Sequence, residues 1–121
     1  MDFVTFELAK KLKEKRFNYP CIAHYDINKE LRVVIREPIF WHSDVLSYID
    51  APTISQVLKW LRYEKNIICL PHIDTFEEKW FFYVVKLPQA TDIPEYFSTI
   101  IYNTYEEAAL AGIEYVLDNL L

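Results

Sequence analysis

The chain has 121 residues, of which 52% are hydrophobic and 17% aromatic, and it contains one glycine. An average glycine usage of about 7% would give roughly eight in a chain of this length, so the phosphate-binding loops of P-loop and dinucleotide-binding proteins, which need several clustered glycines, are excluded. The hydrophobic content excludes a disordered chain, and the net charge of −5 argues against nucleic acid as the main partner.

The length and the cysteine content point to one compact domain in a reducing compartment. We expect a single domain over residues 1–121, because a chain of this size can bury a sufficient core without disulfide bonds or a structural metal ion. Cys21 and Cys69 form no disulfide-scaffold pattern, and no signal peptide opens the chain. The longest apolar run, Trp80–Val85, is far shorter than the roughly 20 residues that span a bilayer. The sequence therefore predicts a soluble cytoplasmic protein with no membrane partner.

The first predicted helix covers residues 4–16, where Val4, Leu8 and Leu12 lie one turn apart. Its second half carries a basic cluster that could contact phosphates, which keeps nucleic-acid binding as an alternative function. Cations near the end of a helix also complement its dipole, and no basic groove with interleaved aromatics accompanies them, so nucleic acid is not the favoured partner. The basic cluster consists of Lys10, Lys11, Lys13, Lys15 and Arg16.

A first antiparallel hairpin is predicted from the strands Cys21–Asp26 and Leu31–Arg36, because both runs are rich in β-branched and aromatic residues. A long connection, Glu37–Pro52, follows it. This connection contains Trp41 among other aromatic and acidic residues. It is predicted either to bind a partner or to fold its own aromatics onto the core.

The second predicted helix, residues 54–65, follows Thr53, and Gln56 three positions later completes a capping box. A second hairpin is predicted from the strands Ile67–Ile73 and Lys79–Leu87. The latter strand is apolar on both of its faces. It is therefore either covered twice or part of a subunit interface.

The third predicted helix covers residues 105–120 and follows Thr104, with Glu107 completing another capping box. It is apolar over most of its circumference, which is typical of a helix buried against more than one layer. The only glycine, Gly112, forms a smooth patch with neighbouring alanines, and we expect this patch to let the helix approach the sheet or a partner helix closely. The turns that would ordinarily use glycine are expected to use asparagine instead, at Asn18, Asn28, Asn66 and Asn103.

Both hairpins begin with the same string, C-x-x-H-x-D, which suggests a duplicated α-β-β unit. Two cysteines and two histidines could bind zinc, so a metal-binding protein is a second alternative. Side chains alternate along a strand, however, and residues three apart point to opposite faces, which favours buried free cysteines instead. The candidate ligands are Cys21, His24, Cys69 and His72.

The same strings place each histidine two residues before an aspartate, on the same strand face. Such a pair could act as an oriented general base. Aspartate is also favoured where a hairpin turn begins, because its carboxylate accepts backbone hydrogen bonds there. No nucleophile or second acid is placed to complete a mechanism, so no catalytic residue and no cofactor are assigned.

Three segments carry a family resemblance: Phe3–Lys15, Ala51–Arg62 and Thr104–Leu120. Together they resemble a family of small uncharacterised proteins from gut bacteria and their phages or mobile elements. The resemblance implies a mobile-element context and brings no activity or cofactor. The chain departs from the pattern at Arg16 and Asn66, where similar sequences often carry glycine, although asparagine can also adopt the left-handed C-cap conformation.

The sequence thus predicts an α+β fold in the order α-β-β-α-β-β-α, with helices packed on antiparallel sheet. The predicted function is that of a small non-catalytic interaction protein that binds a protein partner or itself, as a homodimer. The candidate interaction residues are Trp41, Trp80, Phe82 and Gly112.

Overall fold

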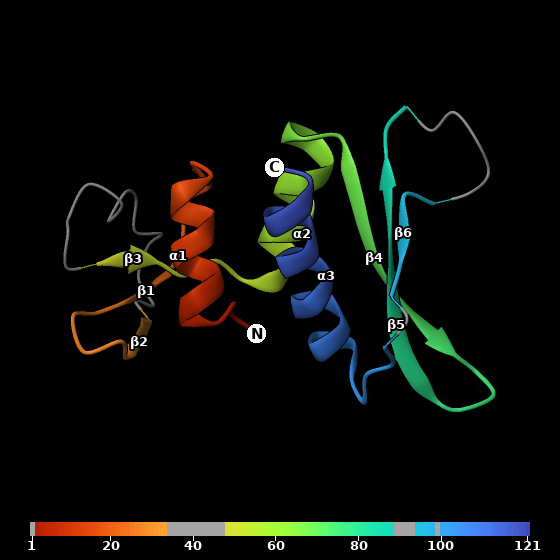
Figure 1. Cartoon of the computed structure of the whole chain (residues 1–121). Helices are drawn as coiled ribbons and strands as arrows, with labels where there is room; N and C mark the ends of the chain where they lie inside the picture. The colour runs from red at the N-terminus through yellow and green to blue at the C-terminus, as the bar shows by residue number, and fades with distance from the viewer. Residues whose placement is uncertain (1, 34–47, 89–93, 99) are drawn as a thin grey trace. The chain divides into compact units, whose positions relative to one another are not determined.

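The computed structural model describes residues 2–33, 48–88, 94–98 and 100–121. These residues form three helices and two three-stranded antiparallel sheets, which confirms the predicted α+β class (Figure 1). The chain divides into two compact units, Met1–Gln56 (unit 1) and Val57–Leu121 (unit 2). Each unit contains one of the two sheets. None of the helices within the described ranges is long and apolar enough to cross a membrane.

The sheet of unit 1 has the order β2-β1-β3, with β1 at Ala23–Tyr25, β2 at Leu31–Val33 and β3 at Ile49–Asp50. The predicted hairpin of β1 and β2 is confirmed, with Tyr25 opposite Leu31. The first strand is shorter than predicted at both ends, and the part of the second strand beyond Val33 lies outside the described residues. The sequence missed β3 because two residues inside a long connection give no periodic signal.

Helix α1, Phe6–Glu14, covers this sheet from one side and packs against β3. It begins later than residue 4 because Thr5 is the N-cap, and its side chain accepts a hydrogen bond from the Leu8 N–H. At the other end, Phe17 N–H donates to the Leu12 carbonyl, and Arg16 has a φ of 64°. This is a Schellman ending, in which a left-handed residue closes the helix.

The core of unit 1 is made by the inner side of α1 and the residues that flank the sheet. Val4, Leu8 and Leu12 are buried, as the helical spacing predicted. The Tyr25 hydroxyl donates to the Val4 carbonyl at 2.6 Å, and the Tyr25 ring meets the edge of Phe6 at 5.6 Å. Backbone hydrogen bonds from Val4 N–H to Pro52 and from Ile54 N–H to Asp2 join the chain's start to the start of the second helix.

That second helix, α2 at Ile54–Glu64, begins in unit 1 and continues into unit 2. The predicted capping box is present: Thr53 N–H donates to the Gln56 side chain, and Gln56 N–H donates to Thr53 Oγ1. The helix buries Val57, Trp60 and Leu61. Its end at Asn66 is left-handed, with a φ of 57°.

The sheet of unit 2 has the order β4-β5-β6. Strands β4, Ile67–Asp74, and β5, Lys79–Lys86, form the predicted second hairpin, in a register that pairs Cys69 with Val84. Strand β6, Tyr96–Phe97, was not predicted, again because it is only two residues long. Helix α3, Tyr105–Asn119, packs on β4 and β5 and covers one face of this sheet (Figure 1).

The contact between α3 and the sheet is close at Gly112. A Cβ atom built there would lie 2.5 Å from the Cys69 Sγ atom and 3.1 Å from the Phe82 ring. Ala108 and Ala109 are buried beside it. The smooth patch therefore faces the sheet of its own unit, which is one of the two arrangements that the sequence left open.

Candidate functional site

The face of the unit 2 sheet that points away from α3 is apolar and aromatic, and we name it the outer face. Side chains on β4 and β5 alternate, so Cys69 and Phe82 point toward α3 while their neighbours point away from it. The name covers its apolar and aromatic part, Ile68, Leu70, His72, Phe81, Tyr83, Val85 and Phe97; the pair Asp74 and Lys79 continues the same side of the sheet toward the hairpin turn.

Four rings on the outer face are in mutual contact. Phe81 lies 5.3 Å from His72, 6.5 Å from Tyr83 and 6.4 Å from Phe97, measured between ring centroids. Tyr83 also lies 6.0 Å from Phe97. Rings at such distances gain from edge-to-face and offset contacts, so the cluster forms one continuous aromatic surface.

This surface is open to solvent within unit 2. Leu70 is 40% exposed and Phe97 is 51% exposed, and Phe81 and Tyr83 are half-buried. Among the described residues of unit 2, no helix or strand covers the outer face. None of its seven residues is an Asp, Glu, Lys or Arg. Val85 is buried and the other six residues are at least partly exposed, so the seven form an uncharged apolar cluster at the surface of unit 2.

Neither edge strand of the same sheet is suited to pair with a further strand. The Phe82 N–H donates to Ser98 Oγ at 3.1 Å, and the Phe82 carbonyl accepts from the Ser98 N–H at 2.9 Å, so both groups point away from β4. Pro71 lies opposite Phe82, and its backbone nitrogen therefore points to the free edge of β4. Proline has no N–H to offer a further strand. The other edge, β6, is only two residues long. Face-to-face packing is therefore favoured over strand addition.

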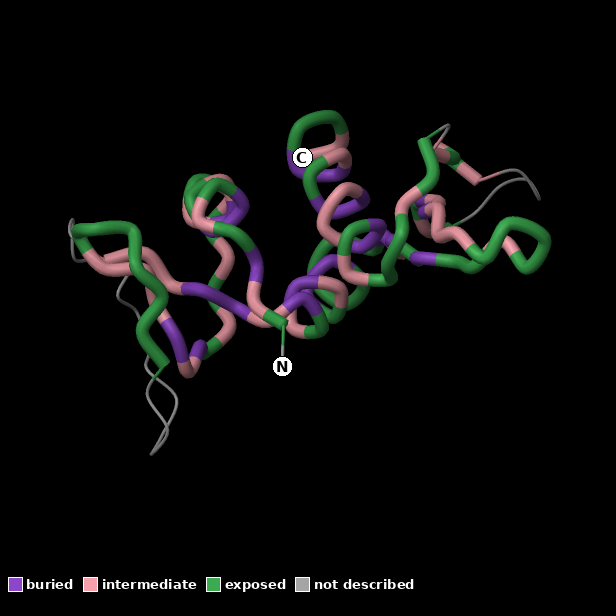
Figure 2. Tube along the Cα trace, turned by 90° about the horizontal axis from the view of Figure 1, so that it is seen from below, coloured by how far each residue is buried: buried purple, intermediate pink, exposed green. Residues whose placement is uncertain are grey.

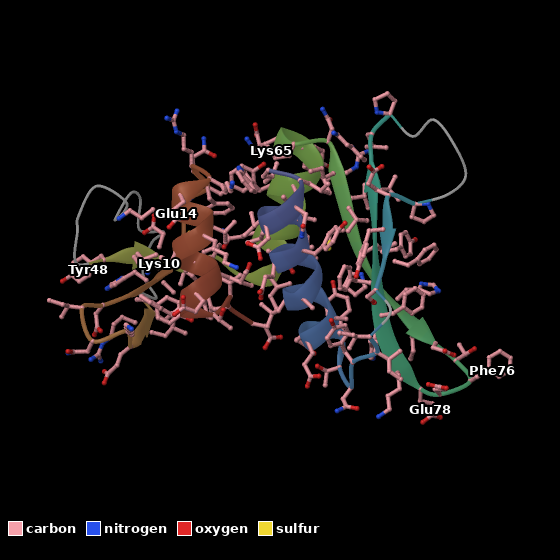
Figure 3. The ribbon with its side chains drawn as sticks, in the orientation of Figure 1. Lys10, Glu14, Tyr48, Lys65, Phe76 and Glu78 are labelled. Atoms are coloured by element: carbon pink, nitrogen blue, oxygen red, sulfur yellow. The ribbon has the colours of Figure 1, made fainter. Side chains whose placement is uncertain are left out.

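The tip of the β4–β5 hairpin carries an exposed apolar residue that lies apart from the outer face. Phe76 is 97% exposed, in a turn whose four residues, 75–78, are all exposed (Figure 2). Figure 3 shows it projecting from this tip, with Glu78 beside it. Glu77 precedes Glu78, so the tip is a solvated acidic turn and not part of a continuous apolar surface.

The predicted interaction residues lie elsewhere than at the outer face. Phe82 and Gly112 are buried between the sheet and α3. Trp80 is half-buried on the same side, with its ring 5.5 Å from that of Tyr105. Trp41 lies outside the described residues. The sequence showed that this strand is apolar on both faces, but helical amphipathicity could not say which face α3 would cover.

Cys69 and His72 point to opposite faces of β4, as strand alternation predicted, whereas Cys21 lies before β1 begins. Cys69 is buried against Gly112, whereas His72 is on the outer face. Cys21 is buried and donates to the Tyr19 carbonyl, whereas the His24 ring packs at 4.8 Å on Tyr48. Within the described parts of the chain, no group of three or more His, Cys, Asp or Glu side chains could hold a metal ion.

Burial dominates the chemistry of both thiols. It raises the pKa of Cys69 to about 12 and, with a smaller contribution from the Asp50 carboxylate, it raises the pKa of Cys21 to about 12 as well. The thiolate is the nucleophilic form of cysteine, so neither thiol is activated for nucleophilic chemistry at neutral pH.

The two aspartates of the H-x-D strings serve the hairpin turns. Asp26 Oδ1 accepts hydrogen bonds from the N–H groups of Asn28 and Glu30, and Arg32 donates to Oδ2 at 3.0 Å. These bonds lower the pKa of Asp26, the Glu30 N–H contributing most. Asp74 likewise accepts from the Phe76 N–H at 2.9 Å. The turn interpretation of both aspartates is thus supported by their hydrogen bonds.

The basic cluster lies at the C-terminal end of α1 and just beyond it. Lys11 and Lys13 are in the last turn of the helix, where cations complement the helix dipole. Lys10 and Arg16 are exposed, and Lys15 is the C-cap. The cluster thus surrounds a helix end, and of its members only Lys13 lines a described pocket, a small one shared with Phe17 and Asp50.

Comparison with protein-family models, with curated proteins and with solved structures found no match to this chain.

Proposed function

We propose that this protein is a small, non-catalytic, cytoplasmic interaction protein that forms a homodimer through the outer face of unit 2. The observation that carries the proposal is the cluster of His72, Phe81, Tyr83 and Phe97, four rings in contact on a sheet face that α3 leaves uncovered. Two such faces can stack about 10 Å apart, with their strands about 30° from parallel, as in a β-sandwich.

A second copy is the best-matched occupant of this face for an electrostatic reason. The chain has a net charge of −5, and a basic partner attracted by that charge would contact acidic residues on the surface of this protein. The seven residues of the outer face include none, and the acidic residue that continues this side of the sheet, Asp74, lies opposite Lys79 at the hairpin end, so pairing the seven residues with a second copy buries apolar surface without an unpaired charge. A two-fold axis through the face places the same patch on both copies.

The contact is expected to be modest in strength. A standard interface buries about 800 Å² on each partner, and a fully buried aromatic side chain supplies roughly 150–250 Å². The outer face contributes three benzenoid rings that are already partly covered. We therefore expect association in the micromolar range.

Analytical ultracentrifugation with a pair of charge variants tests the proposal. Leu70→Glu places a carboxylate at an exposed position of the outer face, and it should shift the dimer–monomer equilibrium by at least about tenfold because a charge would be buried without a partner. Phe76→Glu makes a comparable change at the hairpin tip and should sediment as the wild type does.

Far-UV circular dichroism would verify that both variants fold. A wild-type protein that stays monomeric at several hundred micromolar would refute the proposal. So would a Leu70→Glu variant that associates as strongly as the wild type.

The resemblance to small proteins of gut bacteria and their mobile elements adds a context to this proposal, in which a phage or mobile element encodes the protein. It supplies no reaction for the dimer to carry out.

A further inference from the structure

Unit 2 contains an open groove on the α3 side of its sheet, opposite the outer face. It has a volume of about 320 Å³, which is within the range of small-ligand sites. Strands β5 and β6, helix α3 and Tyr102 all contribute to it. Its lining residues are Phe82, Tyr96, Tyr102, Ala111, Glu114, Tyr115 and Asp118.

Stacked and tilted rings form the walls of this groove. Tyr96 and Tyr115 are stacked, with centroids 3.9 Å apart and planes 16° apart. The buried Phe82 lies 5.6 Å from Tyr96, 6.2 Å from Tyr115 and 6.3 Å from Tyr102. Four aromatic rings from four chain segments thus line one groove. The ring faces that the Tyr96–Tyr115 stack leaves uncovered carry negative electrostatic potential.

Two carboxylates lie at the rim. Glu114 and Asp118 are one turn apart on α3 and both are exposed. No lysine or arginine is among the described lining residues, and the sequence contains none after Lys86. Burial raises the pKa of Tyr102, and Tyr96 and Glu114 add smaller contributions, so Glu114 lies close enough to act on the ring side of the groove.

We infer that this groove binds an organic cation with an apolar surround, an alkylated ammonium group. Aromatic faces attract such a cation most strongly where it is partly desolvated, and the methyl groups of a quaternary ammonium fill an aromatic space that a strongly hydrated ion does not. The rim carboxylates add long-range attraction and orient the cation toward the rings. The group could belong to a free small molecule or to a modified lysine side chain of a peptide.

Chemical-shift titration of the ¹⁵N-labelled protein tests the inference with three probes: choline, a short peptide containing trimethyllysine, and 3,3-dimethylbutanol, the uncharged isostere of choline. We expect at least one cation to shift the signals of the groove residues saturably and the isostere to shift them much less. Tighter binding of choline would identify a free small molecule as the source, and tighter binding of the peptide would identify a side chain. Equal binding of the isostere, or no binding of either cation up to tens of millimolar, would overturn the inference.

Two sets of variants separate the contributions of charge and ring. Glu114→Gln with Asp118→Asn should weaken cation binding about three- to tenfold, because exposed carboxylates contribute modestly. The matched control, Glu77→Gln with Glu78→Gln, removes the same charge from the hairpin tip and should leave binding within about twofold.

Tyr96→Leu should weaken binding as well, and Tyr96→Phe should restore it, because phenylalanine keeps the ring face. Thermal unfolding of each variant would verify its fold. If the rim variant and the tip control bind alike, or if Tyr96→Leu binds as tightly as Tyr96→Phe, the inference is wrong. The outer face takes no part in these changes, so failure here leaves the proposed dimer standing.

Discussion

At the scale of single residues, the shortage of glycine means that other residue types adopt left-handed backbone conformations. Four residues in the described part of the chain adopt left-handed conformations: Arg16, Lys29, Asn66 and Glu78. The sequence predicted that asparagines would replace glycine in the turns, and of those four asparagines only Asn66 is left-handed. The geometry of a helix end or a hairpin turn decides which position must be left-handed, so residue type alone did not indicate Arg16, Lys29 or Glu78.

Glu78 offers the cleanest test of this backbone cost. Glu78→Gly should raise the free energy of unfolding by about 0.5–1 kcal/mol, because glycine adopts a positive φ without steric penalty. Glu77→Gly, one residue earlier and without a positive φ, should lower it by a similar amount because it adds only chain entropy. Urea unfolding measures both. A Glu78→Gly variant less stable than the wild type would contradict the assignment.

The buried thiols predict a dependence of stability on alkaline pH. Their pKa is raised from an ordinary value of 9.0 to about 12 in the folded state, so their contribution to stability is complete below about pH 9. Above that pH the unfolded chain loses thiol protons that the folded chain keeps. Each thiol then lowers the free energy of unfolding by up to about 1.4 kcal/mol near pH 10, and the loss continues toward the folded pKa.

Urea unfolding near pH 7.5 and near pH 10 checks this for the wild type and for the double variant Cys21→Ala with Cys69→Ala. The double variant should lose less stability between the two pH values. Tyr25 and Tyr102, whose pKa values burial also raises, stay in both proteins and cancel in the comparison. Equal losses would show that the thiols ionise in the folded state.

At the scale of elements, the sequence predicted all three helices and both hairpin pairings, because each has a periodic pattern or a turn signal of its own. The start of α1 was misplaced because Thr5 caps it inside the apolar pattern. Strands β3 and β6 were missed because their pairing depends on contacts with β1 and β5 and not on local sequence. Likewise, only the packing of α3 decided which face of β5 would be covered.

The close contact of α3 with the sheet makes Gly112 a sensitive position. Gly112→Ala should gain about 1 kcal/mol of helix propensity but lose more to overpacking against Cys69 and Phe82, for a net destabilisation of about 1–2 kcal/mol. Combining it with Cys69→Ala should relieve part of that cost. The double variant should therefore lose at least about 0.5 kcal/mol less free energy of unfolding than the two single variants lose together. Chemical unfolding of the wild type, the two single variants and the double variant measures the four free energies that this comparison needs. A stabilising Gly112→Ala would mean that the helix lies farther from the sheet.

At the scale of the whole molecule, unit 2 places its two candidate sites on opposite faces of one sheet. The groove faces α3 and combines aromatic rings with carboxylates. The outer face is aromatic and carries no Asp, Glu, Lys or Arg. The sequence predicted an interaction surface on this strand from its doubly apolar pattern. It could not predict the groove, whose residues come from segments that only the fold brings together.

The most direct test of the homodimer is an isotope-filtered nuclear Overhauser measurement on a mixture of ¹³C-labelled and unlabelled protein at a concentration where sedimentation shows association. The account predicts cross-peaks between copies that involve the ring protons of Phe81, Tyr83 and Phe97. Cross-peaks confined to residues outside the outer face, or the absence of any between copies, would contradict it.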